Sequence, residues 1–239
     1  MTHRPAIGSI VPSSNRVVER TLAGIMPHFP AIDSCVARIT FYGAGNGQPA
    51  DGYCDEAYRH AAWNLGHAGV GVVCWNGTRG AGLGLDADRG LATVMAEAAG
   101  CPATTASLAA VRLLNAFGAA RIGIVAPGDA GQAREAAAGL GRDLTGVRAL
   151  GLADNHAASR VPASRIVALA REIAAEAKPD AILVWSTNLP GLDAVAPLES
   201  ELGIPVIDSA TLGVWACLRE IGADIARAAH LGRIFTIGA

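Results

Sequence analysis

The sequence has few charged residues and no long apolar run. Asp, Glu, Lys and Arg make up 17% of the 239 residues, and Lys and Arg form no cluster. With a formal net charge of −2, the chain is not expected to bind nucleic acid or an anionic membrane surface. No apolar stretch is long enough to cross a membrane, and the apolar run near the N-terminus is too short for a signal peptide. We therefore expect a soluble, cytoplasmic protein.

Cysteine and histidine are scarce and show no metal-binding pattern. The five cysteines are odd in number and lack CxxC spacing, so neither a disulfide framework nor a zinc site is predicted. The six histidines show no metal-ligand spacing either, and no metal or organic cofactor is expected. Hydrophobic residues reach 51%, which makes disorder implausible. The length allows one large domain or two of about 100–150 residues.

Short apolar runs alternate with longer alanine-rich segments. The apolar runs predict strands at 6–12, 35–42, 69–76, 121–127, 147–153, 180–186 and 204–209. The segments with helical spacing include 86–99, 106–117, 131–141, 163–177 and 210–221. This alternation is typical of βαβ units and predicts an α/β fold with parallel sheets flanked by helices.

The order of motifs occurs twice in the chain. The paired stretches are 7–19 with 122–135, 71–82 with 182–191, and 101–119 with 204–223. We therefore expect two similar α/β lobes, 1–118 and 119–239, facing each other across a cleft. Ligands of open parallel sheets bind beyond the carboxyl ends of the strands. This rule places the following segments around one site: 12–15, 76–79, 127–129 and 186–188.

Two familiar motifs are incomplete here. Gly80, Gly82 and Gly84 begin a dinucleotide pattern whose third glycine would fall on Leu85 or Ala87. The stretch 45–50, "GNGQPA", fits a looser pattern but lacks the tight entry from strand to helix. Neither GxxxxGK nor GxSxG occurs. Nucleotide binding and nucleophile-elbow hydrolysis are therefore not favoured.

Small polar residues follow the first predicted strand and precede a helix. Ser14 or Asn15 could cap that helix by accepting hydrogen bonds from its free backbone N–H groups. The same N–H groups and the helix dipole also favour a bound carboxylate. Both interpretations can hold at once.

Taken together, these stretches resemble the Asp/Glu racemase superfamily, in the branch of maleate cis-trans isomerases and arylmalonate decarboxylases. The resemblance covers nearly the whole chain and rests on 7–21, 71–80, 152–162, 184–195 and 203–222. It implies two α/β lobes with the site between them. It also implies a cofactor-independent reaction on a small carboxylate, and a homodimer is usual in the superfamily.

The family's mechanism depends on two cysteines, one from each lobe, because a thiol pKa can be tuned to the working pH. Gly77 aligns with the first cysteine, where decarboxylases also have glycine, and Ser186 aligns with the second. We expect Gly77, Thr78 and Ser186 to mark the catalytic positions. The nearest thiol, Cys74, is predicted to be a small buried apolar residue. Gly128 stands where the family has a tyrosine.

The resemblance implies that the substrate-binding residues remain. Ser14 and Asn15 match a carboxylate-binding loop, and Asn155 matches an asparagine of maleate isomerases. Thr78 and Thr187 match donors around a substrate carboxylate.

Arg79 replaces a small polar residue of the family pattern. It could form a bidentate pair with a carboxylate, or it could be an ordinary loop arginine. An unassisted Ser186 hydroxyl cannot replace a thiolate base, so we expect it to donate a hydrogen bond instead.

Three functions stay open at this point. The first is an isomerase or lyase acting through an enediolate-like intermediate. Loss of both thiols least affects decarboxylation, whereas Ser14, Asn15 and Asn155 make the chain as a whole more similar to the maleate isomerases. The second is a hydrolase or hydratase, whose water Ser186, Asn76 and Asn188 would orient and His156 would deprotonate. The third is a carboxylate-binding protein without activity.

Overall fold

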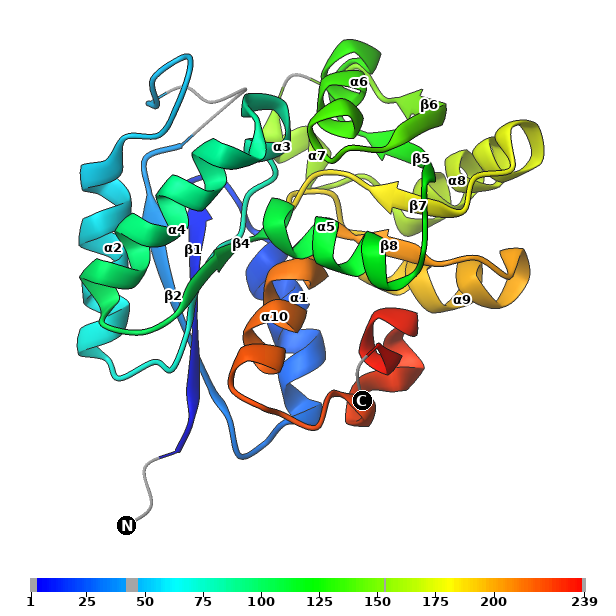
Figure 1. Ribbon diagram of the computed structural model, residues 1–239. Helices are drawn as coiled ribbons and strands as arrows, with labels where there is room; N and C mark the ends of the chain where they lie inside the picture. Colours follow the sequence, from blue (N-terminus) through cyan, green and yellow to red (C-terminus); the bar gives the residue numbers. More distant parts are fainter. Residues whose placement is uncertain (1–3, 42–46, 153, 238–239) are drawn as a thin grey trace.

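The computed structural model describes residues 4–41, 47–152 and 154–237. Two four-stranded parallel sheets lie side by side, each flanked by helices (Figure 1). The strand orders are β2-β1-β3-β4 and β6-β5-β7-β8, which are the same order repeated. The predicted α/β fold with two parallel sheets is therefore confirmed.

The first sheet is built from the N-terminal part of the chain. Its strands are β1 (Ala6–Pro12), β2 (Asp33–Ile39), β3 (Val73–Trp75) and β4 (Ala103–Thr105). The helices that precede β4 are α1 (Val17–Ile25), α2 (Asp55–His67), α3 (Gly80–Leu83) and α4 (Leu85–Ala99). A short 3-10 helix, Met26–His28, follows α1. Helices α2 and α4 pack against each other and cover one face of this sheet.

The second sheet is built from the C-terminal part. Its strands are β5 (Arg121–Ala126), β6 (Asp143–Ala149), β7 (Ala181–Val184) and β8 (Val206–Asp208). The longer helices that follow β4 in the chain are α5 (Ala106–Ala116), α6 (Ala130–Gly139), α8 (Ala163–Ala177), α9 (Leu192–Leu202) and α10 (Ser209–Glu220). The short helix α7 (Asn155–Ala158) precedes α8, and two 3-10 helices, Ile225–Leu231 and Arg233–Thr236, end the fold.

The predicted elements differ from the structure mainly at their ends. β3 begins at Val73 instead of residue 69, because Gly69 has a φ of +79° and forms the turn after α2. β6 ends at Ala149, since Gly151 has a φ of +66° and turns the chain away from the sheet. Residues 42 and 153, where two strands were predicted to end, and residues 45–46 of the rejected glycine motif lie outside the described residues.

One apolar core joins the two sheets. A single cluster of buried side chains includes Ile7 of β1, Ile124 of β5, Leu183 of β7 and Ile207 of β8. Helix α10 follows β8 in the chain, yet it packs mainly against α5, α1 and strands β1 and β3. The second half of the sequence therefore supplies a helix that covers the first sheet.

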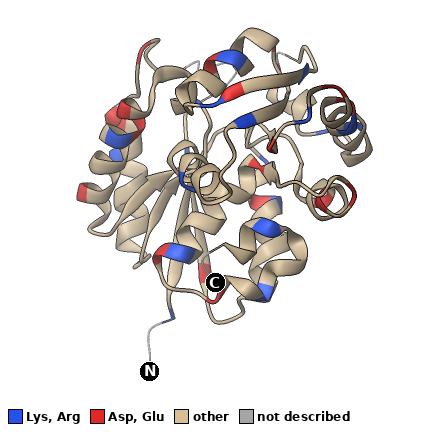
Figure 2. Ribbon diagram, turned by 45° about the vertical axis from the view of Figure 1, so that its right-hand side comes forward, with Lys and Arg blue, Asp and Glu red and all other residues tan. Residues whose placement is uncertain are grey.

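The charged residues lie mainly on the outer helices and loops (Figure 2). None of the described helices is long and apolar enough to span a membrane.

Candidate functional site

A cavity of about 650 Å³ opens at the carboxyl ends of the strands, between the two sheets. A volume of this size suits a small organic ligand. Its wall comes from the segments that follow β1, β3, β5 and β7, as the sequence predicted for a shared site. Eight of the ten predicted site residues line it: Asn15, Gly77, Thr78, Arg79, Asn155, Ser186, Thr187 and Asn188. Ser14 and Asn76 are not in its wall.

Asn15 uses both ends of its side-chain amide within the protein. Its Oδ1 accepts from the backbone N–H groups of Val17 and Val18, at 2.9 and 3.0 Å, and so caps α1. Its Nδ2 donates to the carbonyl oxygen and to Oγ1 of Thr187, at 3.1 and 3.0 Å. The capping role considered for this loop is confirmed, and the same residue ties the first sheet to the second.

Three further hydrogen bonds extend this connection. Asn188 accepts from the backbone N–H of Arg16 at 3.3 Å and donates to the carbonyl oxygen of Asn155 at 2.7 Å. Asn155 in turn donates to Oγ of Ser14 at 2.9 Å. Together with the bonds of Asn15, these contacts form a polar seam across the floor of the site, defined by Ser14, Asn15, Asn155, Thr187 and Asn188.

Asn76 is completely buried, and its Nδ2 donates to the carbonyl oxygen of Ala210 at 3.4 Å. A Cβ placed on Gly213 would lie 2.6 Å from that Nδ2, so α10 passes directly over the Asn76 amide. Asn76 therefore faces α10 and not the cavity.

Ser186 lies in the cavity wall, half-buried at the end of β7. Its Oγ accepts from the backbone N–H of Asn188 at 3.1 Å, and Oγ1 of neighbouring Thr187 accepts from Asn15. A hydroxyl that already accepts keeps its own O–H free to donate. The two adjacent hydroxyls are therefore arranged as hydrogen-bond donors. Within the described residues, no cysteine, histidine or lysine lines the cavity to activate Ser186 as a nucleophile.

Gly77 lies against the indole ring of Trp75. A Cβ built on Gly77 would come within 2.4 Å of two ring carbons and 2.7 Å of Nε1. Trp75 is itself fixed by Tyr58 and Phe41, whose rings lie 4.9 and 5.4 Å from it, centroid to centroid. The space beside the first family cysteine position is therefore filled by an aromatic ring.

Cys74 and His156 do not line the cavity. Cys74 is fully buried in the apolar core on the other face of β3 from Trp75, which confirms its predicted character. A hydrogen bond to the Cys217 thiol and burial together raise the pKa of Cys74, which disfavours its thiolate form. His156 is exposed on α7. The hydratase hypothesis therefore loses the base that it invoked.

Arg79 reaches from the cavity wall into a box of aromatic rings. Its guanidinium carbon lies 5.9 Å from the ring centroids of both Phe41 and Tyr53. Its Nη2 donates to the carbonyl oxygens of Pro49 and Ala50. Arg79 is thus held in the wall, and the alternative of a solvent-facing loop arginine does not describe it.

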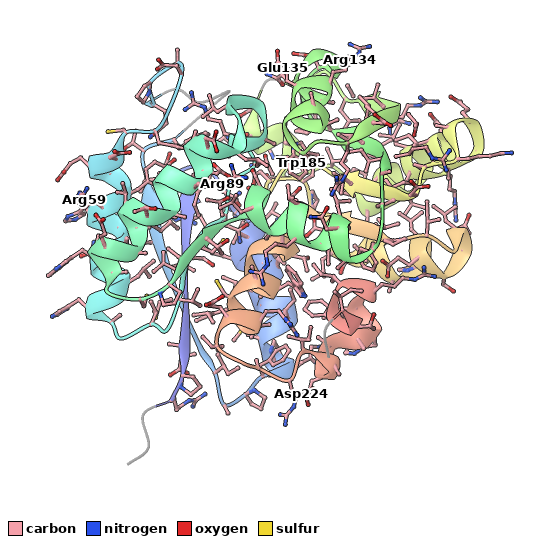
Figure 3. The ribbon with its side chains drawn as sticks, in the orientation of Figure 1. Arg59, Arg89, Arg134, Glu135, Trp185 and Asp224 are labelled. Atoms are coloured by element: carbon pink, nitrogen blue, oxygen red, sulfur yellow. The ribbon has the colours of Figure 1, made fainter. Side chains whose placement is uncertain are left out.

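The sequence analysis did not identify the side chains that α6 contributes. Gln132 lines the cavity, and a Cβ on Gly128 would lie 2.3 Å from its Oε1. The Gln132 amide therefore covers Gly128, where the family has a tyrosine. Asp129 and Glu135 also line the site, and Figure 3 shows Glu135 on α6 and Trp185 at the end of β7. The sequence pointed to this region through the segment 127–129, predicted to lie at the site, and through the missing tyrosine, but neither signal extended to Gln132 or Glu135.

Among the described residues, no group of three or more His, Cys, Asp or Glu side chains is arranged to hold a metal ion. The polar groups in the cavity wall are hydroxyls, amides and one guanidinium, with two carboxylates on the side of α6.

This chain is similar in sequence to arylmalonate decarboxylases and to a maleate isomerase. A family model described as arylmalonate decarboxylase matches residues 47–235. Arylmalonate decarboxylase of Bordetella bronchiseptica is 31% identical over 240 residues, covering 97% of this chain and 96% of that protein. Maleate isomerase of Nocardia farcinica (strain IFM 10152) is 31% identical over 121 residues, covering 49% of this chain and 48% of that protein.

A solved structure of the same family has the same fold. A crystal structure of an arylmalonate decarboxylase variant in its liganded form superposes with a TM-score of 0.82 at 26% identity, covering 97% of this chain and 98% of that chain. In that variant a glycine is replaced by cysteine and a cysteine by serine.

Proposed function

Because this chain belongs to the arylmalonate decarboxylase family, we propose that it is a cofactor-independent lyase that removes CO2 from a small carboxylic acid. The resemblance inferred from the sequence is confirmed at the level of the family. What the family membership leaves open is the reaction, since the relatives include a lyase and an isomerase. The match to the decarboxylase covers nearly the whole chain, which supports decarboxylation as the first candidate.

The observation that carries the proposal is the pair of hydroxyls at the end of β7. In decarboxylation, the electrons of the breaking C–C bond move onto the carboxylate that remains and form an enediolate. Preorganised donors stabilise this developing charge more than they stabilise the substrate. Ser186 and Thr187 already accept hydrogen bonds from the protein, so their O–H groups are available for this role.

Thr78 completes the donor set from the opposite wall. It lies in the loop after β3, lines the cavity, and is half-buried. The hydrogen bonds found for the described residues include none donated by the backbone N–H groups of Thr78 and Thr187. We assign these N–H groups and the hydroxyls of Thr78, Ser186 and Thr187 to the retained carboxylate.

The polar seam has a different role in this proposal. Ser14, Asn15, Asn155 and Asn188 hold the two walls at a fixed distance. The donors then need no reorganisation as charge develops on the substrate. Asn155 remains close enough to the cavity to contact the substrate directly, because it also lines the wall.

The protonation that follows the loss of CO2 requires a proton donor. After CO2 leaves, the carbanion takes a proton, and this cavity has no thiol in its described wall to deliver it. Water that enters the cavity, or Ser186 acting with that water, supplies the proton in this proposal. Isomerisation through a covalent thiolate adduct is disfavoured for the same reason, since no described cysteine reaches the cavity.

Proton NMR in deuterium oxide tests the proposal directly. The purified protein is mixed with phenylmalonate, methylmalonate, maleate and several α-substituted acids. Decarboxylation is expected to give a product with deuterium at the former malonate carbon. Fumarate from maleate would instead show isomerisation. Binding without any turnover would favour the silent carboxylate-binding protein.

Ser186→Ala then tests the role of the hydroxyl. Loss of one donor to the developing charge is expected to lower kcat about 10²-fold, with a smaller change in KM. Ser164→Ala, on the exposed surface of α8, is the matched control and should keep the original rate. An unchanged kcat in Ser186→Ala would remove this serine from the mechanism.

A further inference from the structure

Arg79 is a cation in the cavity wall without a carboxylate partner. Among the described residues, eight ion pairs are present and none of them includes Arg79. Its Nη1 is enclosed by the protein and has no hydrogen-bond acceptor. The Arg79 side chain is half-buried and its Nη2 already has two carbonyl acceptors, so what the guanidinium lacks is an anionic partner and an acceptor at Nη1.

Two other unpartnered donors belong to the same aromatic box. The hydroxyl of Tyr58 and the Nε1 of Trp75 are buried and find no acceptor. The rings of Tyr53 and Tyr58 lie 5.3 Å apart, and those of Tyr58 and Trp75 lie 4.9 Å apart, so the box is continuous from Arg79 to Trp75. Around Arg79, the unsatisfied groups are therefore N–H and O–H donors.

The nearby acid does not neutralise Arg79. Asp88 accepts from the Tyr53 hydroxyl at 2.5 Å and from the Thr105 hydroxyl, and it forms no ion pair with the guanidinium. Burial raises the pKa of Asp88, which further reduces its value as a counter-charge. Asp88 instead fixes Tyr53, and Tyr53 with Phe41 fixes Arg79. The box therefore holds a cation that has no anionic partner among the described residues.

We propose that Arg79 binds a second anionic group of the substrate, carried on a substituent away from the reacting carbon and retained in the product. This inference rests on the proposed function and specifies its substrate class: substituted malonates whose side chain ends in a carboxylate. The group must be retained, because pairing with a cation stabilises a carboxylate and opposes its loss as neutral CO2. The carboxylate that leaves therefore belongs elsewhere in the cavity.

A matched pair of substrates tests this. 4-Carboxyphenylmalonate and its methyl ester on the ring differ only in the charge that Arg79 would bind. The native protein is expected to turn over the free acid with at least a tenfold higher kcat/KM, mainly through KM. Arg79→Gln should lower kcat/KM for the free acid on the order of 10- to 100-fold, as for loss of a charged hydrogen bond. For the ester, the loss should stay below about threefold.

Two controls separate charge from folding. Arg134→Gln removes the same charge from the exposed surface of α6 (Figure 3) and should leave both substrates unaffected. Arg79→Lys keeps the charge without the planar fork, and it should recover part of the preference for the free acid. Equal losses on both substrates in Arg79→Gln would overturn the proposal.

Binding measured without turnover distinguishes this proposal from the reaction itself. Titration calorimetry with glutarate and with its monoamide reports on the extra charge in a ligand that does not react. If neither malonate reacts but glutarate binding depends on Arg79, the anion site stands and the decarboxylase proposal fails. If the malonates react and Arg79→Gln changes neither their ratio nor glutarate binding, the anion site fails and the decarboxylase proposal stands.

Discussion

Gly77 can be explained both by its alignment with the family and by its packing in the structure. In the sequence it stands where the family has a cysteine in some members and glycine in decarboxylases. In the structure the Trp75 indole occupies the space that a side chain at Gly77 would need. Any side chain at position 77 would therefore have to displace Trp75, whatever its chemistry.

Gly77→Cys is expected to destabilise the protein. A Cβ 2.4 Å from the indole forces Trp75, Tyr58 or the loop to move, and overpacking of this kind costs about 1–3 kcal/mol. Urea denaturation followed by tryptophan fluorescence measures the free energy of unfolding. Gly82→Cys is the matched control, since Gly82 also lines the cavity and a Cβ there meets nothing within 4 Å. Equal stability of the two variants would show that Trp75 moves without cost.

For the residues of the polar seam, the sequence predicted their position near the site but not their contacts. Motif position indicated that Asn15, Asn155 and Asn188 belong near the site. It could not show which groups they contact, because Asn15 and Thr187 are separated by 172 positions in the chain. Asn76 illustrates the opposite case. It follows a strand as the others do, but α10 covers it, and that packing has no local sequence signal.

At the scale of elements, segments with strong periodicity were predicted most accurately. The strand Ala6–Pro12 and the helix Ala163–Ala177 have the predicted ends. The helices α2 and α9 were not among the segments singled out. α2 has a weak apolar stripe with five charged or histidine side chains, and α9 contains Pro197. Their helical structure depends on packing against α4 and α8.

The junction of β8 and α10 is capped by a buried acid. Asp208 accepts from the backbone N–H and the hydroxyl of Thr211, at 3.0 and 2.8 Å, and so begins the helix that covers the first sheet. Burial raises the pKa of Asp208 to about 6. The folded protein therefore binds this proton more tightly than the unfolded chain does.

Asp208→Asn is expected to change how stability depends on pH. With the native residue, the free energy of unfolding falls as pH rises from about 4 through about 6, by about 3 kcal/mol for this group. Asparagine still accepts at the cap but does not titrate, so this fall should disappear. Urea denaturation of both proteins between pH 4 and pH 7 measures the difference. Asp193→Asn, at an exposed position in the first turn of α9, should keep the native pH dependence.

At the scale of the whole molecule, the repeated sequence predicted the repeated sheet. It could not predict that α10 would cross to the first sheet, because the exchange is decided by packing between residues far apart in the chain. The shared core and the polar seam together place the donors of one sheet opposite the aromatic box of the other. A site built in this way depends on both halves, so loss of the seam should affect stability and function together.

Asn15→Ala tests that dependence. The change leaves the N–H groups of Val17 and Val18 and the hydroxyl and carbonyl of Thr187 without their partner. Loss of a cap and of a buried hydrogen bond should together lower the free energy of unfolding by about 2–4 kcal/mol. Because one apolar core spans both sheets, fluorescence and far-UV circular dichroism should still report a single urea transition. Asn64→Ala, on the exposed surface of α2, should stay within about 0.5 kcal/mol of the native protein. Two separated transitions in Asn15→Ala would mean that the seam, and not the core, makes the two sheets unfold as one unit.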